Sequence, residues 1–407
     1  MTILGFPEAV IAPLVRAVAD APDRDTVAER FARAAWSRIA EPGDGDAGRL
    51  VAELGAERAL AAVVARTRDE TAPGAVAIPA AALARWRGRV DAAEVQLLLR
   101  QAARFAAALV VPGDEDWPTG LDELGEHAPF ALWVRGDRAH LRALSRSIAI
   151  VGARAATAYG EHVAMESASG LVDRGVAVVS GAAYGIDGAA HRAALASQGT
   201  TIAFLAGGVD RFYPAGHDQL LRAIEERGAV VAEVPPGVAP SRWRFLQRNR
   251  LIAAATGATV VVEAGWRSGS INTANHAAQL GRPIGVVPGP ITSSASAGCH
   301  RLLRESEALC VTSAAEMAQL LGEAEPPTPD AAGSAAEAAV GLSATRMRLL
   351  DAMSTRAGRA PDQLSTISGL APDRVRAELG LLELEGLARL RPSGWIRTVP
   401  DGAATAR

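Results

Sequence analysis

The residues best suited to chemistry in this chain are four closely spaced arginines with aromatic side chains between them. No carboxylate lies between Val234 and Val262, and aromatic residues make up only 4% of the whole chain. Guanidinium groups bind phosphates through paired hydrogen bonds, and aromatic rings offer flat faces on which unpaired bases stack. The segment therefore predicts an interface for single-stranded nucleic acid. The residues that we expect to form it are Arg242, Trp243, Arg244, Phe245, Arg248, Asn249 and Arg250.

The same segment has a structural alternative. Trp243 and Phe245 could pack into a core while the arginine stems cover its rim. We favour binding for the cluster as a whole, because aromatic residues are scarce and no acid balances the arginines. For Trp243 alone the two interpretations stay equal.

Glycines and hydroxyl residues follow several short apolar runs, where strand ends would meet helix N-termini. Glycine lets an anion approach the backbone closely, and free N–H groups at a helix N-terminus attract negative charge. Tight turns and simple N-capping are the alternatives. Asp187 and His191 fit structural roles better than catalysis. The predicted phosphate or anion loops contain Gly152, Ser180, Gly181, Gly185, Gly207, Gly208, Ser268, Gly269 and Ser270.

Several cofactors are disfavoured by the residues themselves. The chain has no lysine, which excludes a Walker A loop, a pyridoxal-phosphate Schiff base and a lysine nucleophile. The turn after Val151 lacks the G-x-G-x-x-G pattern of a dinucleotide site. Cys299 and His300 are adjacent, which is not the spacing of a zinc pair. We expect no cofactor and no metal.

The elements that must position these residues form an α/β domain. Short continuous apolar runs separated by helix-length segments are typical of strands buried on both faces of a parallel sheet. We predict a Rossmann-like, doubly wound parallel sheet, with an edge strand at 130–134 leading into it. The predicted parallel strands are 148–151, 176–179, 201–205, 230–231, 259–262 and 284–287.

Composition divides the rest of the chain. Residues 1–104 are rich in Ala and Arg at helical spacing, which predicts a small helical domain, followed by the Rossmann-like domain at 105–321. Residues 322–341 are rich in Pro, Ala, Gly and Glu and predict a linker. Residues 342–399 read as three helices and a β wing, with Val375, Leu379 and Leu382 on one helix face and 394–396 in the wing. This pattern predicts a winged helix.

Charge and hydropathy limit the partners. The net charge is −3, so a nucleic-acid site must be a local patch. No apolar run approaches the roughly 18 residues of a membrane span, and no cationic stretch precedes the apolar N-terminal residues as in a secretory signal. With only Cys299 and Cys310, a reducing cytoplasm is the expected location.

The run from Ile148 to Gly289 resembles the DNA-processing protein A (DprA/Smf) family. The shared motifs are IVGAR, SGAAYGID followed by AH, LAGG with YP, F-x-x-R-N-R, VVVEA, SGS-I-x-TA, and GRP leading to VPG. The helical N-terminus is similar to the sterile-alpha-motif-like domain of that family. The predicted winged helix is similar to the family's common C-terminal module.

The resemblance implies a function as well as a fold. It implies sequence-independent binding of single-stranded DNA, protection of incoming strands and loading of RecA recombinase in natural transformation, by a homodimer and without catalysis. Arg154 would contact a phosphate and Phe245 a base, while Arg248 and Arg250 would shape the basic pocket. Where relatives often carry lysine before the phenylalanine, this chain has arginine at 242 and 244.

Two other classes remain as alternatives. Nucleoside-monophosphate phosphoribohydrolases also combine a Rossmann-like sheet with anion-binding glycines, but their motif P-G-G-x-G-T-x-x-E places the catalytic glutamate after the glycines. Here Glu263 precedes Gly265. A winged-helix regulator with an α/β sensor domain is the third class, because the C-terminal module alone fits it.

Overall fold

The computed structural model describes residues 2–3, 6–68, 77–322, 344–355 and 357–398. Contacts divide the chain into two compact units, Met1–Ala324 and Glu325–Arg407, which are described separately. The expected linker, 322–341, lies outside the described residues except for its first position. No helix among the described residues is long and apolar enough to cross a membrane.

The first unit is built around a nine-stranded sheet with the order β11-β10-β9-β5-β6-β7-β8-β4-β3. The seven strands from β11 to β8 pair in parallel, while β4 and β3 extend the sheet in antiparallel fashion. The predicted doubly wound parallel sheet is therefore confirmed. The strands are β3 (Ala108–Val110), β4 (Leu132–Gly136), β5 (Ser147–Val151), β6 (Ala177–Ser180), β7 (Thr201–Leu205), β8 (Ala229–Ala232), β9 (Ala258–Val261), β10 (Ile284–Val286) and β11 (Leu309–Cys310).

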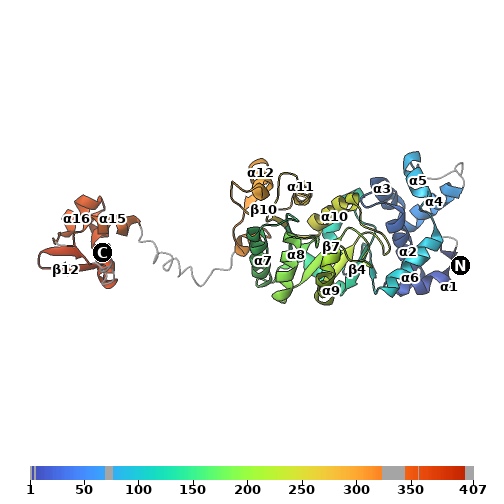
Figure 1. The fold of residues 1–407 in the computed structure, drawn as a ribbon, viewed down its shortest axis with the longest axis horizontal. Helices are drawn as coiled ribbons and strands as arrows, with labels where there is room; N and C mark the ends of the chain where they lie inside the picture. Colours follow the sequence, from blue (N-terminus) through green and yellow to red (C-terminus); the bar gives the residue numbers. More distant parts are fainter. Residues whose placement is uncertain (1, 4–5, 69–76, 323–343, 356, 399–407) are drawn as a thin grey trace. The chain divides into compact units, whose positions relative to one another are not determined.

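Strand β5 shows why its sequence is continuously apolar. Ile148 and Ile150 belong to the core on one face of the sheet, whereas Ala149 and Val151 belong to the core on the other face. Helices cover both faces, so neither set of side chains reaches water (Figure 1). One face is covered by α7 (Ala158–Val172), α8 (Ile186–Ala196), α9 (Asp218–Arg227) and α13 (Ala314–Gln319), the other by α10 (Arg242–Ala255), α11 (Ser270–Gln279) and α12 (Ala297–Glu305).

The edge of the sheet differs from the prediction. The run expected as an edge strand forms β4, but β4 lies between β8 and β3, so β3 is the edge. Trp133 in β4 is fully buried because the N-terminal helices cover it; its indole N–H lies 3.3 Å from the Ser37 hydroxyl. The N-terminal helices are therefore continuous with one core of the sheet.

The N-terminal part is helical, as the composition indicated. Its helices are α1 (Glu8–Arg16), α2 (Arg24–Ile39), α3 (Gly45–Leu54), α4 (Ala56–Arg68), α5 (Ala80–Arg87) and α6 (Ala92–Arg104), after the short strands β1 (Thr2–Ile3) and β2 (Phe6–Pro7). Trp36 and Trp86 meet edge to face at 5.5 Å and are almost fully buried. Such pairs favour this geometry because ring edges are positive and ring faces negative.

The second unit has the predicted winged-helix order. It contains α15 (Ala344–Ala352), α16 (Pro361–Ser368), α17 (Pro372–Leu384) and the antiparallel pair β12 (Ala388–Arg391) and β13 (Gly394–Arg397). Val375, Leu379 and Leu382 are buried on one face of α17, which confirms the helical spacing. Trp395 lies in the wing, half-buried against this core.

The strand order reverses between β5 and β9. The chain adds β6, β7 and β8 on one side of β5 and places β9, β10 and β11 on the other. In open parallel sheets a crevice forms outside the carboxyl ends of the strands at such a reversal, because the connections leave in opposite directions. The loops after β5 and β9 should therefore frame a binding site.

Candidate nucleic-acid interface

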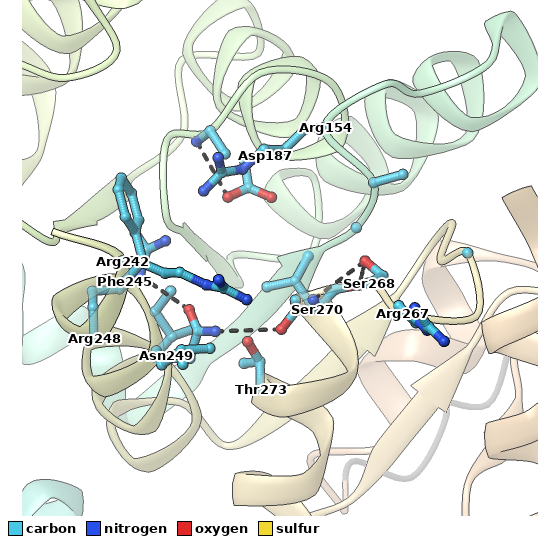
Figure 2. A pocket seen from close by; sticks show the side chains of 18 of the residues that line it. Arg154, Asp187, Arg242, Phe245, Arg248, Asn249, Arg267, Ser268, Ser270 and Thr273 are labelled. Atoms are coloured by element: carbon cyan, nitrogen blue, oxygen red, sulfur yellow. Dashed lines mark hydrogen bonds between the residues drawn. The ribbon is translucent and has the colours of Figure 1, made fainter.

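A cavity of about 770 Å³ lies at this reversal point (Figure 2). Its walls come from the loops that follow the parallel strands and from the N-terminal parts of α10 and α11. Figure 2 shows Arg154 and Asp187 on one side of the pocket and residues of α10 and α11 on the other. The sequence prediction that this edge of the sheet holds a site thus agrees with the position of the cavity.

Helix α10 presents one face to the cavity. The helix begins after Ser241, whose hydroxyl accepts a hydrogen bond from the Arg244 N–H at 3.3 Å. Residues three and four apart share a helix face, so Arg242, Phe245 and Asn249 point the same way. All three line the cavity, together with Arg248. The predicted pairing of cations with an aromatic ring is therefore present on one surface.

Phe245 lies at the centre of a group of cations and rings. Its ring is half-buried, with the Arg154 guanidinium 4.9 Å and the Arg248 guanidinium 5.9 Å from its centroid. The exposed Tyr213 ring is 5.6 Å away. Guanidinium groups stack on ring faces because the π electrons are negative there. The contacts hold Phe245 at the pocket surface, so the alternative in which it is a core residue does not hold.

Three arginines around the cavity have no acidic partner. Arg154, Arg242 and Arg267 are exposed, and no carboxylate of the described residues lies within 4.0 Å of them, whereas Arg244 and Arg250 of α10 form ion pairs. Unpaired cations in one concave surface raise the local concentration of anions. The pocket is therefore a positive patch on a chain of net charge −3.

Arg248 has a different environment, since it is 6% exposed. Its Nη1 donates to the Gly181 carbonyl at 2.8 Å and to the Phe204 carbonyl, which ties α10 to the ends of β6 and β7. Burial lowers the pKa of Arg248 to about 10, an effect opposed by the Asp187 carboxylate and reinforced by Arg154. Arg248 thus stays charged at neutral pH and forms the floor of the pocket.

Asp187 organises the loop after β6. Its Oδ2 accepts the N–H groups of Gly181 at 3.1 Å and Ala183 at 3.3 Å, so the carboxylate folds the loop back onto the start of α8. Burial raises the pKa of Asp187, against the opposing influence of Arg248. His191, one turn further, lies 2.7 Å through Nδ1 from the Thr201 hydroxyl. These contacts agree with the packed, hydrogen-bonded role expected of His191, whereas Asp187 holds the loop and does not cap α8, the structural role that its place before the helix suggested.

Asn249 links α10 to the start of α11. Its Nδ2 donates to the Gly269 carbonyl at 3.3 Å and to the Asn272 side chain at 3.2 Å. The hydroxyls of Ser268 and Ser270 lie 2.7 Å apart beside this turn. Asn249, Ser268, Gly269 and Ser270 line the cavity, and all four are among the predicted site residues.

Glu263 fixes the loop that carries Arg154. Its two carboxylate oxygens accept the Thr157 N–H at 2.9 Å and the Thr157 hydroxyl at 2.7 Å, and its carbonyl accepts the Ala153 N–H at 2.7 Å. Glu263 as a whole is only 2% exposed, and it does not line the cavity. Glu263 is therefore placed to position Arg154 rather than to reach a ligand.

The structure does not bring every predicted contact residue to the cavity. Arg244 points to the N-terminal helices, where Nε and Nη2 donate to Glu41 at 3.1 and 2.8 Å. Arg250 is buried and pairs with Glu233 at 2.6 Å. Trp243 is 56% exposed but lies outside the lining. A helix presents side chains all around its axis, so a run of consecutive residues divides between opposite faces.

At most of the predicted anion-loop glycines, close packing explains why the residue is glycine, because a larger side chain would collide with its neighbours. A Cβ on Gly181 would meet the Arg248 guanidinium at 2.2 Å, and one on Gly185, where φ is +73°, would meet the Ala153 carbonyl at 2.3 Å. Ser180 donates from its buried hydroxyl to the Ile150 carbonyl. Gly207 and Gly208 pack against the loop at 235–240. Only Gly152 among the glycines before β9 lines the cavity, where it also packs against Ile186.

Among the lining residues that the sequence analysis did not predict are an aromatic residue and a cation, Trp266 and Arg267. Trp266 and Arg267 lie in the loop between β9 and α11 and are both exposed at the cavity. The signal was present, since an adjacent tryptophan and arginine repeat the chemistry of Arg242 and Trp243. Among the described residues, no group of three His, Cys, Asp or Glu side chains is placed to hold a metal ion.

Comparison with known proteins agrees with the resemblance. The family model described as "DNA recombination-mediator protein A" matches residues 108–322, and a model for the DprA winged helix domain matches residues 326–394. A putative DNA processing protein DprA of Mycobacterium tuberculosis is 43% identical over 91% of this chain and 96% of its own.

More distant relatives cover less of the chain. Protein Smf of Escherichia coli is 36% identical over 59% of this chain and 70% of its own. The X-ray structure of DNA processing protein A from Streptococcus pneumoniae superposes with a TM-score of 0.58 at 29% identity, covering 72% of this chain and 96% of that one. Both the sheet and the winged helix thus have counterparts in a single family.

Proposed function

Since this chain belongs to the DprA/Smf family of DNA-processing proteins, we propose that it binds single-stranded DNA in the pocket where the sheet reverses its strand order. The observation that carries the proposal is the combination of three unpaired arginines with the half-buried Phe245 ring on one concave surface. Phosphates and unpaired bases are the two parts of a single strand that such a surface recognises.

We assign phosphate contacts to Arg154, Arg242 and Arg267. An arginine that gives up no existing ion pair can bind a phosphate in two hydrogen bonds without leaving a buried carboxylate unpaired. Arg244 and Arg250 would have to abandon Glu41 and Glu233, so we exclude both from direct contact. Arg248 acts as the buried positive floor beneath the strand.

We assign base stacking to Phe245. Every base has a flat face, so stacking on a ring tolerates all sequences. The site lies in a pocket between loops, and α10 reaches it with one face rather than as a protruding helix that could enter a major groove. Binding should therefore depend on strand form and not on base sequence.

We further propose that the bound strand is protected and passed to RecA recombinase in natural transformation, and that the protein acts as a non-catalytic homodimer. Family membership supports the proposed protection, the transfer to RecA and the non-catalytic homodimer. RecA assembly on single-stranded DNA should become faster with the protein present. Arg154→Ala should lose this effect in proportion to its loss of DNA binding.

The strand-form proposal is tested by titrating the full chain with oligo-dT, a mixed-sequence single strand and a duplex of equal length. We expect similar affinities for both single strands and much weaker binding of the duplex. Affinity for the single strands should fall with salt at a log–log slope of about −0.7 per phosphate neutralised. Equal affinity for the duplex would refute the proposal.

A further inference from the structure

The loop after β9 carries a second aromatic residue at the cavity. Trp266 lines the cavity and is 55% exposed, whereas Trp36 and Trp86 of the N-terminal helices and Trp133 of β4 are almost fully buried. An exposed indole loses the burial of a large apolar surface. Trp266 lies on the positive, concave surface, where a bound ligand would cover it.

The Trp266 indole is held from one side by a cation. The Arg301 guanidinium of α12 lies 4.8 Å from its ring centroid. Because one side of the ring is occupied by this group, the exposed surface of the indole lies away from Arg301. A base stacking there would complete a layered arrangement of guanidinium, indole and base.

Helix α12 is docked so that Arg301 reaches this position. A Cβ on Gly298 would meet the Gly265 and Ala264 carbonyls at 2.6 and 2.7 Å, so only glycine permits this close approach. The Gly298 N–H also donates to the Ala264 carbonyl at 2.7 Å. Arg301 follows three residues later, on the same helix face. The packing of α12 thus sets the place of the guanidinium beside Trp266.

The loop itself is fixed at both ends. Near its start, Glu263 accepts hydrogen bonds from the loop that carries Arg154, and at its end Gly269 accepts a hydrogen bond from Asn249 of α10. A loop anchored in this way presents its side chains with little loss of conformational freedom on binding. Arg267, the next residue after Trp266, supplies an exposed cation with no carboxylate partner among the described residues.

We infer that Trp266 is a second base-stacking platform, backed by Arg301, and that Arg267 holds the phosphate that joins its nucleotide to the one on Phe245. This inference rests on the proposed function. It adds a second nucleotide subsite across the reversal point, on the loop after β9. Arg301 is a positioning residue here, since it acts through the indole.

The experiment uses the full chain and an oligo-dT of about 16 nucleotides. Trp243 provides the matched control, because its indole is equally exposed, at 56%, but lies outside the cavity. We expect DNA-dependent quenching of tryptophan fluorescence in wild type and in Trp243→Phe. In Trp266→Phe most of this quenching should vanish, while the phenyl ring keeps part of the affinity.

Affinity gives an independent result. Trp266→Ala should weaken oligo-dT binding by about 5- to 100-fold, and Trp243→Ala by less than about twofold. The melting temperature of Trp266→Ala should match wild type because the indole is largely exposed. Arg301→Gln should increase the mobility of the Trp266 indole, seen as a lower steady-state anisotropy of its emission in the free protein.

The experiment distinguishes failure of the proposed function from failure of the Trp266 platform alone. If wild type does not bind oligo-dT, the proposed function fails and the second subsite fails with it. If wild type binds, but Trp266→Phe keeps its quenching or Trp266→Ala binds as well as Trp243→Ala, only the Trp266 platform is refuted.

Discussion

The Arg154 guanidinium lies over the Phe245 ring at 4.9 Å, although the two residues come from the loop after β5 and from α10. One side chain carries charge and the other does not. In the proposed binding mode, Phe245 would stack on a base and Arg154 would bind a phosphate, so stacking and charge would contribute separately to affinity. Substitutions at these positions should separate them.

Phe245→Leu should weaken single-strand binding by about 1–3 kcal/mol, because leucine keeps apolar volume but offers no flat face. The salt slope should stay unchanged, since no charge is removed. The measurement is a salt series of oligo-dT titrations with parallel thermal melting.

Phe204→Ala is the stability control, because Phe204 is fully buried in β7 and its truncation should cost about 3–5 kcal/mol of folding free energy. A comparable loss of stability in Phe245→Leu would mean that Phe245 serves the core rather than the DNA.

Glu263→Ala should weaken single-strand binding although Glu263 does not line the cavity. The substitution removes the acceptor of both Thr157 hydrogen bonds, so the loop with Arg154 becomes less ordered. Glu263→Gln keeps one acceptor oxygen and should lie between wild type and Glu263→Ala. Amide hydrogen exchange at 152–160 should rise in the same order as affinity falls.

The same two variants test the enzyme alternative. Wild type should release no base from nucleoside monophosphates. Turnover by wild type that disappears in Glu263→Gln would instead identify Glu263 as a catalytic acid and reverse our assignment.

His191 makes stability depend on pH. Burial lowers its pKa to about 3, with smaller contributions from His217, Arg248 and Arg192, so the folded protein keeps the ring neutral. The unfolded chain takes up a proton near pH 6.5. Because the unfolded state binds more protons between these values, stability must fall as pH is lowered from about 6.5 toward 3.

His191→Gln should flatten this dependence, since glutamine does not titrate. Thermal melting of both proteins between pH 4 and 7 measures the difference. Parallel curves would show that His191 does not remain neutral in the folded protein.

Much of the architecture could be predicted because the relevant signals are local. Continuous apolar runs such as Ile148 to Val151 require two covered faces, and the spacing of Val375, Leu379 and Leu382 requires a helix with one buried side. The position of β3 outside β4 could not be predicted, since it depends on how the N-terminal helices cover Trp133.

The site was predicted in part for a similar reason. Composition identified the arginine and aromatic run, but only tertiary structure separates Arg242 and Phe245, which face the cavity, from Arg244, which pairs with Glu41. The partners Glu41 and Glu233 lie outside the acid-free run from Val234 to Val262, so the sequence of that run does not reveal them. Likewise, the glycine at 181 is required by the Arg248 side chain, a contact that sequence spacing does not reveal.

The most direct test of the account compares the salt dependence of oligo-dT binding in wild type and Arg154→Ala. Arg222→Ala is the control, because it removes the same charge from an exposed pair with Asp218 on α9. We predict that Arg154→Ala binds more weakly to every single-stranded sequence and that its log–log slope is smaller by about 0.7, with Arg222→Ala matching wild type. Parallel salt dependences for Arg154→Ala and wild type would contradict the central claim that Arg154 holds a phosphate of the bound strand.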